Sequence, residues 1–177
     1  MNLAATIGSL VAMFFGHSWS LRLSRCETKG WLSFHMNQKL PPPSESSMLL
    51  VARSCFEGVK VLARIPDSNT LIAFAIVASQ GVEATLKCHL LQKCKSLKDC
   101  IRLGHDLLKT WDAAAIEGSP IEGPAPDWLR TLNWGHDRPH AFRYLPDKYG
   151  VSAPRADDLL GWWEPVLKAL YRNSSRL

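Results

Sequence analysis

Apolar side chains recur every three or four positions from residue 48 onward, which is the spacing of amphipathic helices. The pattern predicts helices over residues 48–65, 71–93, 106–116, 126–134 and 157–173, with a short helix between Ser96 and Gly104. No alternating pattern is long enough to build a sheet. We therefore expect an all-α fold, a bundle of about four to five helices around one central apolar helix.

The central helix is expected at residues 71–93. Its first half, LIAFAIVA, is apolar all round, as in a helix buried on every side. Its second half, QGVEATLKCHLLQK, combines apolar and polar positions and predicts an amphipathic continuation. The first half should therefore form the middle of the core.

Proline and glycine mark the breaks between the helices. Residues 118–126 contain three prolines and predict a loop, and residues 139–152 are expected to be extended or irregular. Pro165 falls inside the last predicted helix. Because a proline in the middle of a helix costs about 3 kcal/mol, we expect Pro165 in the first turn of the main part of that helix.

Residues 1–43 are expected to lie outside the core, as an irregular leader or a non-native start, with the helical domain at residues 44–177. Pro41-Pro42-Pro43 forms a stiff break that is incompatible with a helix. The apolar run at residues 2–16 has the length of a signal-peptide core, but no Lys or Arg precedes it and it is too short to span a bilayer. A start at Met36 is a further alternative.

The composition is that of an ordinary globular protein, with 177 residues, 46% of them apolar and 21% charged. A formal charge of +5 permits contact with nucleic acid or anionic lipid without requiring it. The cysteine count is five, an odd number, and no two cysteines form a C-x-x-C pair. This pattern argues against a secreted disulfide framework and against a four-ligand zinc site. We expect reduced thiols in a cytoplasmic protein, with no metal, no cofactor and no membrane association.

Two groups of polar residues are candidates for a site or a structural network. Glu83 and Lys87 lie four residues apart on the central helix, so their side chains meet on one face. Such a pair is common on surfaces, but its place in the central helix predicts that Glu83 is buried and paired with Lys87 or Arg143. His105 and Asp106 begin the next long helix, where they can satisfy unpaired backbone amides.

The stretch GVEATLKCHLLQKCKSLKDCIRLGHDLLKTWDAA resembles the core of the HEPN family (higher eukaryotes and prokaryotes nucleotide-binding domains). That family shows an E-x-x-x-K helix, a short connection and a G-H-D-L helix start. A later R-Y pair followed by proline is also common, and Arg143-Tyr144 is similar to it, with Leu145 as an extra residue before Pro146. The resemblance covers roughly residues 46–147 and implies a helical domain directed at RNA or nucleotides.

Many members of this family are metal-independent ribonucleases, often toxins or defence proteins, with an arginine and a histidine separated by four to six residues. Arg130 and His136 have five residues between them, so the resemblance implies that they are catalytic. Along a regular helix the two side chains would point about 120° apart. They converge only if the helix ends near Gly135. The alternative is a surface or capping role for both.

Two functions follow from these observations. The first is a protein directed at RNA or nucleotide phosphates, with ribonuclease activity as one form of this function. Its pocket is expected to be rimmed by Glu83 and Lys87, and the residues around it are Arg130, His136, Arg143 and His105. The second is a non-catalytic interaction module in which the same residues fix the helix packing. Such a module can also form a homodimer. Trp162-Trp163 is expected in the core or in a dimer contact. A basic stretch offers a path for a phosphate backbone: Lys87, Lys93, Lys95, Lys98 and Arg102.

Overall fold

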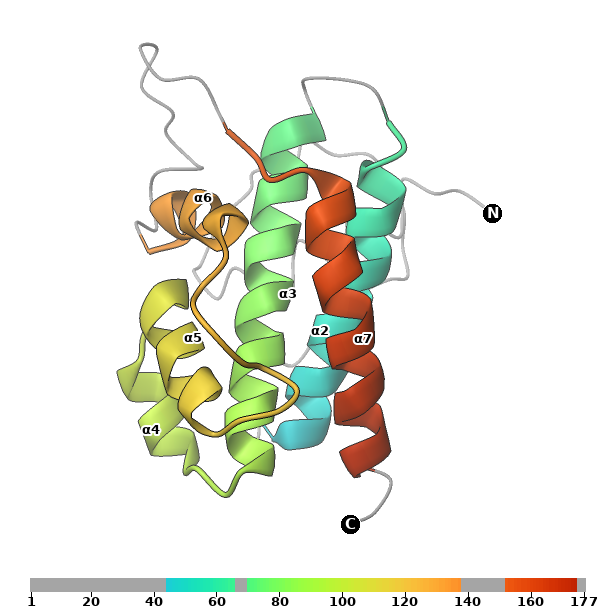
Figure 1. Ribbon diagram of the computed structural model, residues 1–177. Helices are drawn as coiled ribbons and strands as arrows, with labels where there is room; N and C mark the ends of the chain where they lie inside the picture. Colours follow the sequence, from blue (N-terminus) through green and yellow to red (C-terminus); the bar gives the residue numbers. More distant parts are fainter. Residues whose placement is uncertain (1–43, 66–69, 138–151, 175–177) are drawn as a thin grey trace, which may run out of the picture. The chain divides into compact units, whose positions relative to one another are not determined.

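The computed structural model describes residues 44–65, 70–137 and 152–174, which all belong to one unit, Pro41–Leu177. The described residues form helices and no strand (Figure 1), which confirms the all-α class. The expectation for residues 1–43 falls outside the described residues, as do Arg143 and Tyr144. The helices are α2 Glu45–Leu62, α3 Thr70–Gln92, α4 Leu97–Arg102, α5 Leu107–Ile116, α6 Asp127–His136 and α7 Ala156–Ser174.

Helix α3 is the centre of the bundle. It contacts α2, α4, α5, α6 and α7. Helices α2 and α7 pack on each other along one side of α3, and α5 and α6 pack on each other on the opposite side (Figure 1). Side chains on α3 therefore have partners from both pairs of helices within reach.

Burial along α3 is more complete in its second half than the sequence predicted, although Phe74, Ala75 and Ala78 in the first half are also buried. Ten consecutive residues in the second half, Gly81–Leu90, are buried, whereas Ala73 in the first half is exposed. The amphipathic pattern was misleading because the polar side chains of the second half find partners inside the bundle. Thr85 illustrates this, since its Oγ1 donates to the Gly81 carbonyl (2.7 Å) and accepts from the Trp163 indole N–H (2.7 Å).

Gly81 allows three helices to approach closely. A Cβ atom at this position would lie 2.5 Å from the Cβ atom of Cys55 on α2 and closer still to the Trp163 ring on α7. Trp163 in turn packs edge-on against Phe56, with ring centroids 5.5 Å apart. The absent side chain thus fixes how α2 and α7 pack on α3.

The helix ends follow local sequence signals. Ser96 and Asp99 form the capping box that the sequence predicted at the start of α4. Helix α6 extends beyond the predicted end at Trp134 and runs through Gly135 to His136. Gly135 alone therefore does not end this helix.

Pro165 lies in the interior of α7, so the prediction that it begins the main part of this helix is wrong. The apolar face of α7 continues across the proline, with Leu159 and Trp163 buried before it and Leu170 after it. The carbonyl that loses its N–H partner belongs to Gly161, which is exposed and accessible to water. Continuous burial therefore outweighs the cost of one missing hydrogen bond.

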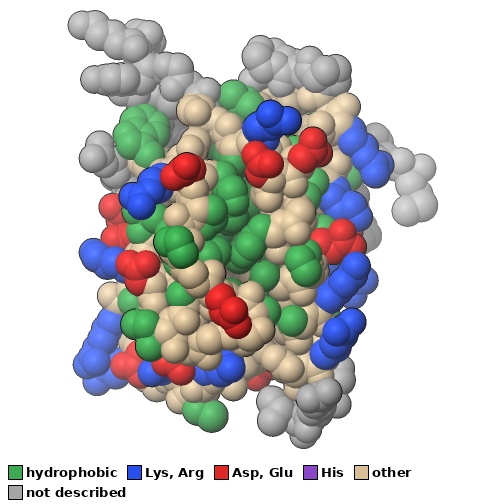
Figure 2. All heavy atoms as spheres, in the orientation of Figure 1, with side chains coloured by type: hydrophobic (Ala, Val, Ile, Leu, Met, Phe, Trp, Pro, Cys, Tyr) green, Lys and Arg blue, Asp and Glu red, His purple; other side chains and the backbone are tan. Residues whose placement is uncertain are grey.

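On the face shown in Figure 2, hydrophobic side chains gather near the centre and charged side chains surround them.

Helix α3 is long and apolar enough to cross a membrane by length and composition, but 67% of its most apolar window is buried in the protein. A core helix of a soluble protein passes the same test, so this is weak evidence for a membrane span.

Candidate functional site

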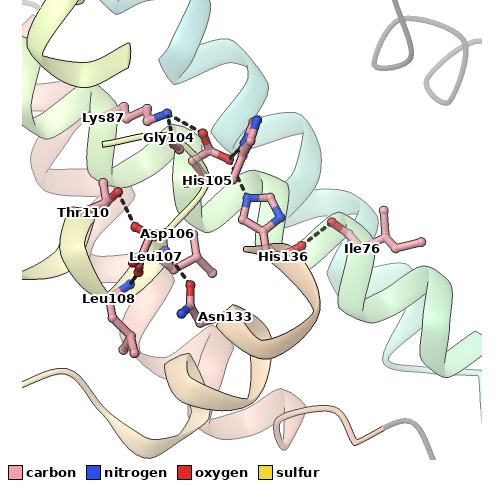
Figure 3. A network of polar contacts seen from close by, with 12 residues as sticks. Ile76, Lys87, Gly104, His105, Asp106, Leu107, Leu108, Thr110, Asn133 and His136 are labelled. Atoms are coloured by element: carbon pink, nitrogen blue, oxygen red, sulfur yellow. Dashed lines mark hydrogen bonds and ion pairs between the residues drawn. The ribbon is translucent and has the colours of Figure 1, made fainter. Parts of the chain in front are cut away.

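Glu83 is the centre of a polar network that joins three parts of the bundle. Its Oε1 accepts a hydrogen bond from Lys87 Nζ (2.5 Å), one turn further along α3. Its Oε2 contacts Nδ1 of His105 (3.1 Å), in the turn between α4 and α5, and Nε2 of His136 (2.5 Å), at the end of α6. Figure 3 shows Lys87, His105 and His136 converging from these elements. Residues far apart in the sequence therefore share one carboxylate.

Lys87 connects this carboxylate to the turn that carries His105. Its Nζ also donates to the Gly104 carbonyl at 2.7 Å. Gly104 has a φ of +63°, a left-handed conformation that a residue with a Cβ adopts at a cost. The glycine thus allows the sharp turn after α4, and the lysine holds that turn against α3.

Asp106 and Asn133 fix the position of His105 from the other side. The Asp106 carboxylate accepts from the amides of Leu108 and Lys109, both at 3.1 Å, and so caps α5. The Leu107 amide donates to Asn133 Oδ1 on α6 at 2.6 Å. No local pattern points to the role of Asn133, because its partner is a backbone amide 26 positions away.

Burial separates the members of the network. The side chains of Glu83 and Lys87 are each 10% exposed and that of His136 is 4% exposed, whereas His105 is 63% exposed. His105 is therefore the member through which the network meets solvent. Its second ring nitrogen, Nε2, has no hydrogen-bond partner within the part of the chain that the structure describes.

The electrostatics of the network favour a charged Glu83 and a protonated His105. Burial alone would raise the pKa of the Glu83 carboxyl, but hydrogen bonds from His105 and His136 and the charge of Lys87 hold it well below its usual value. The hydrogen bond to Glu83 raises the pKa of His105 above its usual value, and burial opposes this only in part. The network thus favours the protonated form of an exposed imidazole.

The same residues are the candidates for a metal site. Donor atoms of Glu83, His105 and His136 all lie within 4.8 Å of one another, and two histidines with one carboxylate are a common ligand set for transition metals. However, the ammonium group of Lys87 already contacts this carboxylate and would repel a divalent cation beside it. With Lys87 beside the carboxylate, these donor atoms therefore favour hydrogen bonds and bound protons over a metal ion.

The structure does not bring Arg130 and His136 together. Helix α6 continues through Gly135, so the break that would let the two side chains converge is absent. Arg130 is 66% exposed and lies 4.0 Å from Asp127, whereas His136 is buried against Glu83. Of the two partners expected for Glu83, the structure places Lys87 beside it, and Arg143 lies outside the described residues.

The basic stretch is partly neutralised. Lys87 points inward to Glu83, Lys95 pairs with Glu117 at 2.7 Å, and Arg102 lies 3.6 Å from Asp99. Lys93 and Lys98 remain exposed. The stretch therefore offers two exposed lysines that make no ion pair with the described residues, rather than a continuous basic path.

Comparison with protein families, with curated proteins and with solved structures found no match to this chain. The HEPN resemblance stays a prediction from the sequence. The function has to be inferred from the network itself.

Proposed function

We propose that the chain is an RNA- or nucleotide-phosphate-directed protein, a metal-independent ribonuclease of the toxin or defence type that the HEPN resemblance implies. The reacting group in this proposal is His105, and Glu83 orients it. The Arg130–His136 pair, which the sequence pattern suggested, is replaced because its members lie on different faces of α6.

The observation that carries the proposal is the Glu83–His105 hydrogen bond, with the histidine exposed and its carboxylate partner buried. A carboxylate bound to one ring nitrogen fixes the tautomer and stabilises the protonated form of the ring. The other nitrogen, Nε2, is then available to a substrate. Geometry and charge agree in making His105 a proton donor.

Cleavage of RNA without a metal needs such a group. The 2′-hydroxyl oxygen gives its proton to water as it attacks the phosphorus atom, and the bond from phosphorus to the 5′-oxygen breaks. The departing 5′-oxygen must receive a proton, and the products are a 2′,3′-cyclic phosphate and a 5′-hydroxyl. A protonated His105 can donate that proton and can attract the phosphate before the reaction. Exposed Lys93 and Lys98 add further positive charge for a phosphate backbone.

The test is an RNA-cleavage assay in the presence of EDTA. We expect the wild-type protein to cleave a mixed-sequence single-stranded RNA, and His105→Ala to lose at least about 100-fold, the usual contribution of a general acid. Lys109→Ala is the matched control, since Lys109 is also exposed at the start of α5. Both variants should keep a cooperative thermal transition.

Arg130→Ala distinguishes this proposal from the pair predicted by the sequence pattern. Because Arg130 lies away from the network, its variant should cleave RNA at the wild-type rate. If Arg130→Ala is inactive and His105→Ala is active, His105 is not the reacting group. Activity that EDTA abolishes would point instead to a metal at Glu83, His105 and His136.

Near-complete burial of Glu83, Lys87 and His136, with mutual hydrogen bonds, favours a second candidate function. In this alternative the chain is a non-catalytic interaction module, and the network fixes how α3, α6 and the α4–α5 turn pack. Wild-type protein without detectable cleavage, together with destabilised Glu83 variants, would support it.

A further inference from the structure

A groove lined by tryptophan and proline lies away from the Glu83 network. Its volume is about 570 Å³, and its walls come from α5, α7, the start of α6 and the loop between α5 and α6. This region belongs to the face on which Figure 2 shows hydrophobic side chains gathered near the centre. We call it the tryptophan groove, and its main lining residues are Trp111, Trp128, Trp162, Pro120, Pro124 and Pro126.

The three indole rings form a stepped apolar surface. Trp111 is buried and contacts both other rings, with centroids 6.3 Å from Trp128 and 5.3 Å from Trp162. The centroids of Trp128 and Trp162 are 5.1 Å apart, and both side chains are only partly buried. The fold therefore leaves the faces or edges of two tryptophans accessible.

Two of the tryptophans that line the groove have an indole N–H group without a protein partner among the described residues. The indole N–H of Trp111 is satisfied by the Gly123 carbonyl at 3.0 Å. No hydrogen bond from the indole N–H of Trp128 or Trp162 occurs within residues 44–65, 70–137 and 152–174. A ligand that offers carbonyl oxygens along an apolar body would satisfy both.

A polyproline II segment has this chemistry. Its backbone makes no internal hydrogen bonds, so its carbonyls are free, and its proline rings pack well against aromatic side chains. Such a segment also loses little conformational entropy on binding, because proline restricts it beforehand. An open groove walled by tryptophan and proline fits it better than a compact polar ligand.

Charge narrows the choice of partner further. No Lys or Arg lines the groove, and Glu122 is the charged side chain in its wall. Glu122 is exposed and makes no ion pair with the described residues. Residues 110–129, which include most of the lining, contain acidic residues but no Lys or Arg, although the chain as a whole carries +5. A phosphate backbone would be repelled here, whereas a basic residue beside the prolines would be attracted.

We propose that the tryptophan groove binds a proline-rich segment of a partner protein in the polyproline II conformation, with a Lys or Arg of that segment against Glu122. The inference goes beyond the proposed function and does not depend on it. It assigns the tryptophan groove to protein recognition and leaves the Glu83 network to the proposed function.

The experiment uses the full chain and a fluorescein-labelled peptide, Arg-Pro-Leu-Pro-Pro-Leu-Pro, followed by anisotropy and by tryptophan fluorescence. We expect saturable binding that Trp128→Ala weakens at least tenfold. Because Trp128 packs on other rings, that variant can also lose stability, so Glu122→Lys provides a second test at an exposed position. It should weaken binding about threefold to tenfold while keeping the thermal transition.

A charge swap makes the test specific. A peptide with Glu in place of Arg should bind Glu122→Lys more tightly than it binds the wild type. Glu164→Lys is the matched control, since it makes the same charge change on α7 outside the groove lining and should leave affinity for both peptides unchanged. His105→Ala should also bind the peptide normally, which separates this result from the outcome of the cleavage assay.

Several results would overturn the proposal. One is the lack of saturable binding, and another is equal binding of a Gly-Ser peptide of the same charge. Competition by an oligouridylate at the groove would assign this face to nucleic acid instead. Binding that appears only after Pro41, Pro42 and Pro43 are replaced by serine would identify this chain's own proline segment as the occupant.

Discussion

Replacing Glu83 by alanine is the most informative test of the polar network. The side chain is 10% exposed and accepts from Lys87, His105 and His136. Its removal leaves the Lys87 ammonium group in the protein interior with only the Gly104 carbonyl as a partner. A buried charge without a counter-ion is costly, so Glu83→Ala should unfold much more easily than the wild type.

The expected loss of unfolding free energy is about 3 kcal/mol. Breaking a buried ion pair from one side costs about 3–5 kcal/mol, and the remaining hydrogen bond to Gly104 places this case at the low end. With a urea dependence of about 1.5 kcal/mol per molar, the midpoint of urea unfolding should fall by about 2 M. Circular dichroism at 222 nm measures this midpoint directly.

The pair Glu164 and Lys168 provides a matched control, because it has the same four-residue spacing on a helix but is 55% and 64% exposed. Glu164→Ala should leave the urea midpoint almost unchanged. The double variant Glu83→Ala with Lys87→Met should recover part of the loss, since it no longer buries an unpaired cation. Equal midpoint shifts for Glu83→Ala and Glu164→Ala would refute the reasoning.

Three further predictions concern packing, pH and thiol reactivity. Gly81→Ala should destabilise the fold by about 1–3 kcal/mol in thermal unfolding, because a Cβ atom has no space there. Gly161→Ala should be neutral or stabilising by up to about 1 kcal/mol, because a Cβ atom at this position would meet no other atom within 4 Å. The lowered pKa of Glu83 stabilises the fold above pH 4.5, its ordinary value, and the contribution is lost as the pH falls further. The raised pKa of His105 stabilises the fold below pH 6.5, and that smaller contribution is lost as the pH rises through the raised pKa. The urea midpoint should therefore decline both toward acidic and toward alkaline pH. A midpoint that does not change with pH would contradict the network. Cys94 is the exposed thiol among the described cysteines and should react with a disulfide reagent in the native state, while the buried ones react only after unfolding; a Cys94→Ser variant checks the assignment.

Local signals predicted the helices well. The three-to-four spacing of apolar residues placed every long helix to within a few positions, because the long helices other than α3 bury one side, and α3 is apolar enough to be recognised along its length. Capping at Ser96 and Asp106 also followed the sequence, since the interacting atoms lie within four residues. Features of this kind depend on the chain within one or two turns.

Burial along α3 and the position of Pro165 depend on the rest of the bundle and could not be read from local pattern. The second half of α3 is buried because Glu83, Lys87 and Thr85 meet partners from other elements. Pro165 is tolerated because the buried face of α7 continues past it. Nothing in a helical pattern records which distant residue will satisfy a polar side chain.

The candidate site shows the same division. The four-residue spacing of Glu83 and Lys87 is a local signal, and it led to the pair that the structure contains. The approach of His105 and His136 to Glu83 joins positions 22 and 53 residues away, and only the packing of α5 and α6 on α3 brings them together. The Arg130–His136 spacing pointed elsewhere because it assumed a helix end that the structure does not have.

The two candidate functions place different demands on the same carboxylate. Glu83 stabilises the bundle through Lys87 and His136, and it also sets the charge of His105. A change at Glu83 therefore alters stability and chemistry together and cannot separate a catalytic role from a structural one. His105 is different, because it is the exposed member and its removal leaves the buried contacts of Glu83 with Lys87 and His136 in place. If His105→Ala removes cleavage while the protein keeps a cooperative unfolding transition, the network supports chemistry. If it changes neither property, then Glu83, Lys87 and His136 are sufficient for what the network does, and that role is to hold the helices together.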